Sequence, residues 1–187
     1  MLPPLFNGGE STSLRKTYPH WQKLNAQGEP MPSTQGPWQC IVDQQTLLTW
    51  ENKSRDERVH HGKWTYTWSD VATPNKNWPD GSCSQLKHCN SAAQVALANQ
   101  QRWCGKNDWR IPSIEELQTL IDNSYPSPGP LVCPCFLPNT ARSSYWSSSE
   151  DQSRQRLGLN FKTSEISHFP DHASLYLRLV SGPKLQQ

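Results

Sequence analysis

The sequence lacks long hydrophobic runs and a strong charge of either sign. Only 34% of its 187 residues are apolar, and no stretch approaches the roughly 20 apolar residues that span a bilayer. The Leu/Ile/Val-rich strands that a doubly wound α/β enzyme buries in its parallel sheet are also missing. The 18 Lys and Arg against 16 Asp and Glu leave a net charge of +2. We therefore expect neither a membrane span nor a nucleic-acid partner for this chain.

The N-terminus lacks the basic and then apolar layout of a signal peptide. Six cysteines, an even number in a polar and Trp-rich chain, nevertheless indicate disulfides and an oxidising compartment. We therefore expect an exported protein, extracellular or at the cell surface, whose export signal is absent from this sequence.

The cysteines are the strongest structural constraint in the sequence. They are Cys40, Cys83, Cys89, Cys104, Cys133 and Cys135. We expect Cys89 to pair with Cys104, because these two bracket one predicted helix. Cys133 and Cys135 lie so close along the chain that each is expected to pair elsewhere. A metal site or redox pair at these two positions is a weaker hypothesis than a simple crosslink.

The chain divides into an N-terminal segment and one domain. Residues 1–36 contain Pro, Gly and Ser without sustained periodicity, which predicts a linker or an N-terminal arm. Residues 37–187 form the expected domain. Its first run, Trp38 to Trp50, places two short apolar segments around a turn-prone Asp-Gln-Gln, which predicts a hairpin. Residues 63–68 alternate aromatic and polar side chains, as in a half-buried strand.

Two helices are predicted after these strands. Asn90 or Ser91 caps the first, which runs to the glycine of Cys104-Gly105. The second begins at Ser113 and has a capping box with Glu116. Four apolar residues share one face of the second helix: Ile114, Leu117, Leu120 and Ile121.

The last third of the chain predicts strands and loops. Prolines at 126, 128 and 130 are expected to end the second helix. Residues 145–149 form a compact aromatic segment, and strands are predicted over 156–161 and 175–180. The element order and the nine Trp residues predict a loop-rich α+β domain held together by aromatic side chains and crosslinks.

Four segments resemble one known family. Residues 104–117, CGKNDWRIPSIEEL, resemble the CG-x-x-DWRLPT-x-x-EL signature of the Legionella collagen-like protein C-terminal domain family. Three flanking segments resemble its other motifs in the expected order: WQC with residues 43–51, FLPNT with YWSSS, and YLRLVSG. Leu47-Leu48 departs from the Gly-Leu of the family, and Cys133-Pro134-Cys135 has no counterpart there.

The resemblance implies a C-type lectin-like fold with a small twisted antiparallel sheet, two helices and long loops. It also implies an exported bacterial protein, since members are lipoproteins or tips of larger surface proteins. The member that names the family is an adhesin that binds sulfated polysaccharides as a trimer. The chain lacks the EPN, QPD and WND motifs of calcium-dependent lectins, so the fold does not by itself imply lectin chemistry.

The signature residues predict a structural role rather than a binding role. Trp109 is expected to fill the core between the helices, while Asp108 and Arg110 hydrogen-bond to loop backbone. Ligand contact by this triplet is the weaker alternative. The full structural set is Trp50, Asp108, Trp109, Arg110, Pro112, Tyr145 and Trp146.

Candidate ligand-binding residues form the densest basic cluster in the sequence. They are Arg55, Arg58, His60, His61 and Lys63, with Lys162 in a second and weaker cluster. These side chains suit sulfate or carboxylate groups, although an ordinary solvated face is the alternative. His168 and His172 have zinc-like spacing, but Pro170 breaks the helix that would align them. No metal or cofactor is therefore expected.

Three functions compete. The leading hypothesis is an adhesin-like domain that binds a glycan, such as a sulfated polysaccharide, or a protein on a host or cell surface. The second is a structural tip or accessory subunit of a pilus or secreted assembly. The third is an enzyme related to the formylglycine-generating enzymes, which is disfavoured because no base or metal cluster accompanies the cysteines.

Overall fold

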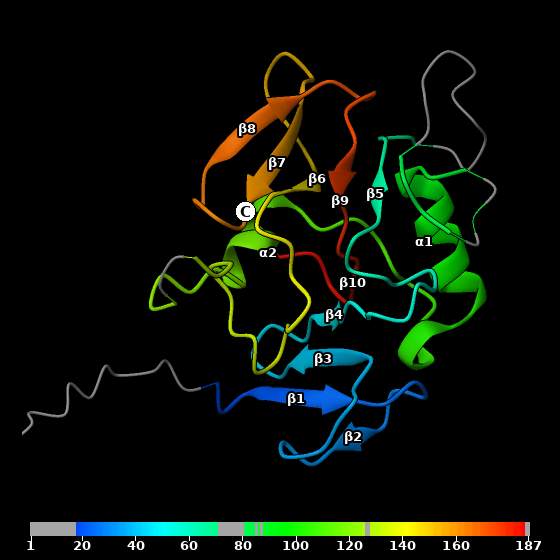
Figure 1. The fold of residues 1–187 in the computed structure, drawn as a ribbon, viewed down its shortest axis with the longest axis vertical. Helices are drawn as coiled ribbons and strands as arrows, with labels where there is room; N and C mark the ends of the chain where they lie inside the picture. Colours follow the sequence, from blue (N-terminus) through cyan, green and yellow to red (C-terminus); the bar gives the residue numbers. More distant parts are fainter. Residues whose placement is uncertain (1–17, 71–80, 85, 87, 126–127, 186–187) are drawn as a thin grey trace, which may run out of the picture.

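The computed structural model describes residues 18–70, 81–84, 86, 88–125 and 128–185, and these form an α+β fold with two sheets (Figure 1). The first sheet, in the order β10-β4-β3-β1-β2, comprises β1 (Trp21–Leu24), β2 (Pro30–Met31), β3 (Cys40–Asp43), β4 (Thr49–Glu51) and β10 (Val180–Ser181). The second, in the order β5-β9-β6-β7-β8, comprises β5 (Thr65–Tyr66), β6 (Ser144–Glu150), β7 (Arg156–Asn160), β8 (Ile166–Phe169) and β9 (Leu175–Tyr176).

The pairing within both sheets is antiparallel, except that β6 and β9 are parallel. The expectation of a single small sheet is wrong, because β9 and β10 follow one another in the chain and yet join different sheets. Alternating hydrophobicity shows which face of a strand is buried but not which strand is its neighbour. The α+β class itself is confirmed.

Both predicted helices are present. The side chain of Asn90 caps α1 (Ser91–Gln100), and a capping box between Ser113 and Glu116 begins α2 (Ile114–Thr119). A short 3-10 helix (Trp103–Gly105) lies between them. α2 ends before the prolines that were expected to stop it, and Pro126 lies outside the described residues. None of the helices in the described part of the chain is long and apolar enough to cross a membrane.

Part of the segment expected to be a linker or arm belongs to the first sheet. β1 pairs with β3 over its whole length, from Trp21 opposite Asp43 to Leu24 opposite Cys40, and β2 continues the sheet at its edge. Residues 1–17 of that segment lie outside the described residues. β8 was not predicted, because most of its side chains are exposed and show no apolar alternation.

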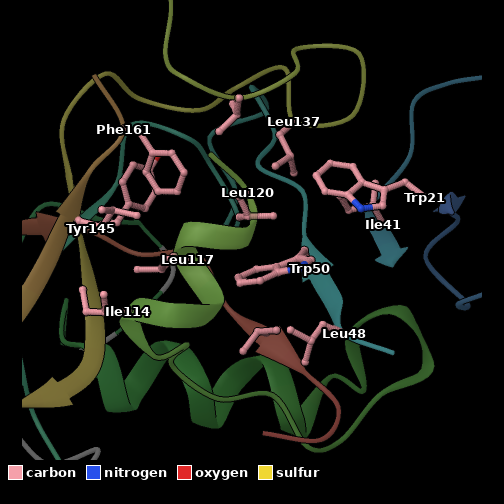
Figure 2. Close-up of a cluster of buried hydrophobic side chains, with 13 residues drawn as sticks. Trp21, Ile41, Leu48, Trp50, Ile114, Leu117, Leu120, Leu137, Tyr145 and Phe161 are labelled. Atoms are coloured by element: carbon pink, nitrogen blue, oxygen red, sulfur yellow. The ribbon is translucent and has the colours of Figure 1, made fainter. Parts of the chain in front are cut away.

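The main core lies between the two sheets and is centred on α2. Figure 2 shows Leu117 of α2 and Leu120, which caps the C-terminus of α2, against Trp50 of β4, with Tyr145 of β6 on the opposite side. All four side chains are at most 1% exposed. A second cluster packs α1 against the second sheet through Trp109, Trp146 and other aromatic residues. The aromatic core predicted from the Trp content is therefore built as two clusters.

The three disulfides are Cys40–Cys104, Cys83–Cys89 and Cys133–Cys135. The predicted Cys89–Cys104 pair is wrong, because α1 separates these residues by roughly 15 Å of helix, whereas a disulfide needs Cα atoms roughly 4–7 Å apart. The expectation that Cys133 and Cys135 pair elsewhere is also wrong. Their Cα atoms lie 5.2 Å apart across Pro134, within the range that a disulfide tolerates.

The entropy of loop closure predicts that two of these disulfides contribute unequally to the free energy of unfolding. Replacing Cys40 and Cys104 with alanine should lower the free energy of unfolding by roughly 4 kcal/mol, and the same change at Cys83 and Cys89 by roughly 2 kcal/mol. The reason is the sequence separation, which is 64 residues for the first pair and 6 for the second. Urea unfolding of the two double variants measures the difference. A larger loss from the short bridge would contradict the assigned pairing.

Candidate functional site

Two adjoining hollows lie along the loop that connects β4 to β5. The main groove, of about 940 Å³, is lined by residues 52–56, 58–60 and 138–139 together with Trp38 and Trp103. The side groove, of about 760 Å³, is lined by residues 61–64 and 138–141 together with Tyr176. Residues 54–55 and 138–139 line both and therefore form a shared wall.

The shared wall is fixed by hydrogen bonds between two distant segments. Asn139 donates from Nδ2 to the carbonyl of Lys53 at 2.6 Å and accepts at Oδ1 from Nε of Arg55 at 2.7 Å. Gly62 lets the two segments approach closely, because a Cβ atom there would lie 2.7 Å from the carbonyl oxygen of Asn139. The β4–β5 loop is thereby held against the loop that precedes β6.

The floor of the main groove rests on a buried carboxylate. Oε1 of Glu51, at the end of β4, accepts hydrogen bonds from Nζ of Lys53 at 2.7 Å and from Nδ1 of His60 at 2.6 Å. Its Oε2 accepts from the backbone N–H of Leu179 at 2.9 Å. Glu51 is fully buried, and Lys53 and His60 are each 3% exposed.

A buried arginine extends this cluster to the loop before β6. Arg178 is 0% exposed and donates to the carbonyl of Glu51 at 2.5 Å and to the hydroxyl of Thr140 at 2.8 Å. We call Glu51, Lys53, His60 and Arg178 the buried charge cluster. It joins β4, the β4–β5 loop and the chain between β9 and β10.

Burial and ion pairing have opposite effects on the pKa values of the side chains in this cluster. Burial alone would raise the pKa of Glu51, but the charge of Lys53 and the hydrogen bond from His60 outweigh it and hold the pKa at about 2. Burial lowers the pKa of Lys53 and of Arg178, and the carboxylate of Glu51 counteracts both shifts. Glu51 is therefore ionised at neutral pH and compensates the positive charge beneath the groove.

Aromatic side chains line the main groove beside this floor. The ring of Trp103 stacks on His60 with centroids 3.8 Å apart. Trp38 donates a hydrogen bond from Nε1 to the carbonyl of Phe136. The Nζ atom of Lys23 makes a cation–π contact with Trp38, at 3.6 Å from the ring centroid. Three buried polar atoms of groove residues have no hydrogen-bond partner in the described structure: Asn52 Oδ1, His60 Nε2 and Trp103 Nε1.

The basic cluster chosen from the sequence divides between the rim and the interior. Arg55 and Arg58 are exposed on the main groove, and Lys63 is exposed on the side groove. His60 and His61, by contrast, are buried, at 3% and 8% exposure, so neither is a surface cation. The ring of each histidine packs against a tryptophan, Trp103 or Trp64, so the two histidines belong to the walls of the grooves.

Lys162 lies apart from this site. It is exposed on the turn between β7 and β8 and lines neither groove. Nε2 of His168 lies 3.1 Å from Oδ2 of Asp151. Within the described residues, no group of three or more His, Cys, Asp or Glu side chains is arranged to hold a metal ion.

Sequence reasoning missed four residues of the site: Glu51, Lys53, Trp103 and Arg178. The available signal was the placement of charge beside strongly apolar positions, as in Trp50-Glu51 and Leu177-Arg178-Leu179. A charged residue in such a run is buried only if it is paired, so the two runs indicate partners for one another.

The Asp108-Trp109-Arg110 triplet forms a corner between α2 and the C-terminal segment of the domain. Asp108 accepts hydrogen bonds from the hydroxyl of Ser181 and the N–H of Gly182. Both terminal nitrogens of Arg110 donate to the carboxylate of Glu116, at 2.6 and 2.7 Å. Trp109 is 2% exposed. These contacts are internal, and the triplet lines neither groove.

The other signature residues are also placed inside the fold. Trp146 donates from Nε1 to the carbonyl of Tyr66 at 2.6 Å, and the hydroxyl of Tyr145 accepts from the N–H of Ala141 at 2.8 Å. The carbonyl of Pro112 accepts from the N–H of Ser148 at 2.7 Å. Trp50 packs in the main core.

The buried charge cluster predicts a loss of stability in acid. Because the pKa of Glu51 is about 2 in the folded chain and 4.5 as its ordinary value, its stabilisation is complete above pH 4.5 and disappears as pH falls towards 2. In the Glu51→Gln variant, the free energy of unfolding should lack this part of its pH dependence, which amounts to about 3 kcal/mol. Urea unfolding between pH 2 and pH 7 measures it.

Glu165→Gln is the matched control, because Glu165 is exposed on the turn before β8. Its acid profile should follow that of the unaltered chain. An unchanged profile in Glu51→Gln would show that the carboxylate does not hold the loops as described.

Comparison with known proteins gives one match. The model of the Lcl C-terminal domain family matches residues 39–181, which include the loops around both grooves. No curated protein and no solved structure matches the chain. The family resemblance found in the sequence motifs is confirmed, and the chain belongs to the Lcl C-terminal domain family.

Proposed function

We propose that this chain is a non-enzymatic binding domain displayed outside the cell, and that it recognises an anionic glycan such as a sulfated polysaccharide. One observation carries the proposal: the exposed cations Arg55, Arg58 and Lys63 surround two adjoining grooves that also contain tryptophan side chains. Guanidinium and ammonium groups bind sulfate and carboxylate oxygens, while aromatic rings offer flat apolar surface to a sugar ring.

The electrostatics of the site favour binding through the rim. Lys53 and His60 below the groove already have Glu51 as a partner. On the rim, Arg58 lies 3.5 Å from Asp56 with both side chains well exposed, and such a pair is worth little in water. The cations of the rim therefore stay available to an anionic ligand, even though Asp56 and Glu57 lie among them.

The fold and the disulfides support the location and the class of domain. Disulfides persist in oxidising compartments, and three of them join all six cysteines of this chain. We propose a C-type lectin-like arrangement, which two short helices and long loops between strands support. Binding would then occur on loops that a rigid scaffold holds in place.

Binding to heparin, as a sulfated probe, tests the proposal. Arg55→Ala/Arg58→Ala/Lys63→Ala should weaken affinity at low salt by about tenfold or more, because each exposed ion pair contributes up to about 1 kcal/mol. Raising the salt concentration should weaken binding of the unaltered chain for the same reason, since salt screens exposed charges. Isothermal titration calorimetry at two salt concentrations measures both effects.

Lys162→Ala serves as a control for loss of a cation away from the site, since this exposed lysine lines neither groove. It should bind heparin as the unaltered chain does. If the triple variant retains full affinity, or if Lys162→Ala loses as much, the grooves are not the binding site. Thermal unfolding confirms that each variant is folded.

A further inference from the structure

The Cys133–Cys135 disulfide is poorly explained as a stabilising crosslink. The sequence separation of its cysteines is 2, against 64 for Cys40–Cys104. Closing so short a loop restricts the unfolded chain least, so this bridge contributes the least stability of the three. Its surroundings in the fold suggest a different role.

The two sulfur-bearing residues differ in their access to solvent. Cys133 is 1% exposed, whereas Cys135 is exposed on the surface next to Pro134. The long-range bridge offers no such access, since Cys40 and Cys104 are 0% and 1% exposed. An external thiol therefore meets Cys135 first.

The buried sulfur has the contacts of a good leaving group. Sγ of Cys133 accepts a hydrogen bond from the hydroxyl of Tyr125 at 2.9 Å and another from the backbone N–H of Cys135 at 3.3 Å. Hydrogen bonds of this kind strengthen when the acceptor becomes a thiolate. Stabilising the reduced form in this way makes a disulfide a stronger oxidant.

We propose that Cys133–Cys135 is a redox-reactive disulfide that oxidises pairs of thiols on a partner by thiol–disulfide exchange. The exposed sulfur of Cys135, the buried sulfur of Cys133 and the hydroxyl of Tyr125 form the reactive site. This exchange is stoichiometric, because it leaves the site as a dithiol, and it is independent of glycan binding.

The exchange takes two balanced steps. A thiolate of the partner attacks Sγ of Cys135, forms a mixed disulfide and breaks the Cys133–Cys135 bond, whose electron pair leaves on Sγ of Cys133. The second thiolate of the partner then attacks the partner sulfur that is bonded to Cys135 in the mixed disulfide. This step forms the disulfide of the partner and releases Cys135 as a thiolate. The partner gains one disulfide, and Cys133 and Cys135 end as a dithiol after taking up two protons.

Reduced glutathione followed by rapid alkylation tests the site in the intact chain. Mass spectrometry should find glutathione on Cys135 and the alkyl label on Cys133 at early times. Cys133–Cys135 should also be reduced at glutathione concentrations that leave Cys40–Cys104 and Cys83–Cys89 intact. Glutathione on Cys133, or reduction of Cys83–Cys89 first, would overturn the proposal.

Tyr125→Phe tests the role of the hydroxyl. Losing one hydrogen bond to the thiolate should shift the glutathione equilibrium about tenfold towards the disulfide. Tyr176→Phe is the matched control, as it makes the same change at another half-buried tyrosine, on β9, and should leave the equilibrium unchanged. An equal equilibrium constant for both variants would overturn the assignment of Tyr125.

Discussion

The ionised carboxylate of Glu51, at the end of β4, joins the loop that follows β4 to the chain that precedes β10. Its two oxygens bind Lys53 and His60 from the loop after β4 and the backbone of Leu179 from the chain before β10. Arg178 extends the contact to Thr140. A buried charge is tolerated only when it is paired and hydrogen-bonded, so these partners fix one another in place. The loops around both grooves depend on this cluster for their position.

Charge is divided between the interior beneath the grooves and their rim. Beneath the main groove Glu51 balances part of the positive charge of Lys53 and Arg178, and the buried charge cluster fixes the loops. At the surface Arg55, Arg58 and Lys63 remain exposed. The disulfide between Cys40 and Cys104 and the two aromatic cores hold this arrangement in a chain with modest apolar content. Rigid loops on a small scaffold are a common basis for recognition.

Local signals in the sequence predicted local structure well. The hairpin between Trp38 and Trp50 and the capping box at Ser113 depend only on neighbouring residues, and both are present. These signals failed where contacts between distant residues determine the structure. β8 is a strand although its side chains are mostly exposed, and Cys104 pairs with Cys40 across 64 residues. The site was predicted in part. The density of basic residues indicated the loop that lines both grooves, but only the fold shows that His60 is buried beside Glu51.

A carboxyl-carbon NMR titration of Glu51 in the folded chain tests the central claim most directly. The buried charge cluster predicts a titration midpoint at a pH of about 2, well below the ordinary value of 4.5, because Lys53 and His60 stabilise the ionised form. A midpoint at or above 4.5 would contradict the account, since burial without effective pairing would then control the carboxyl group and the loops would need another explanation.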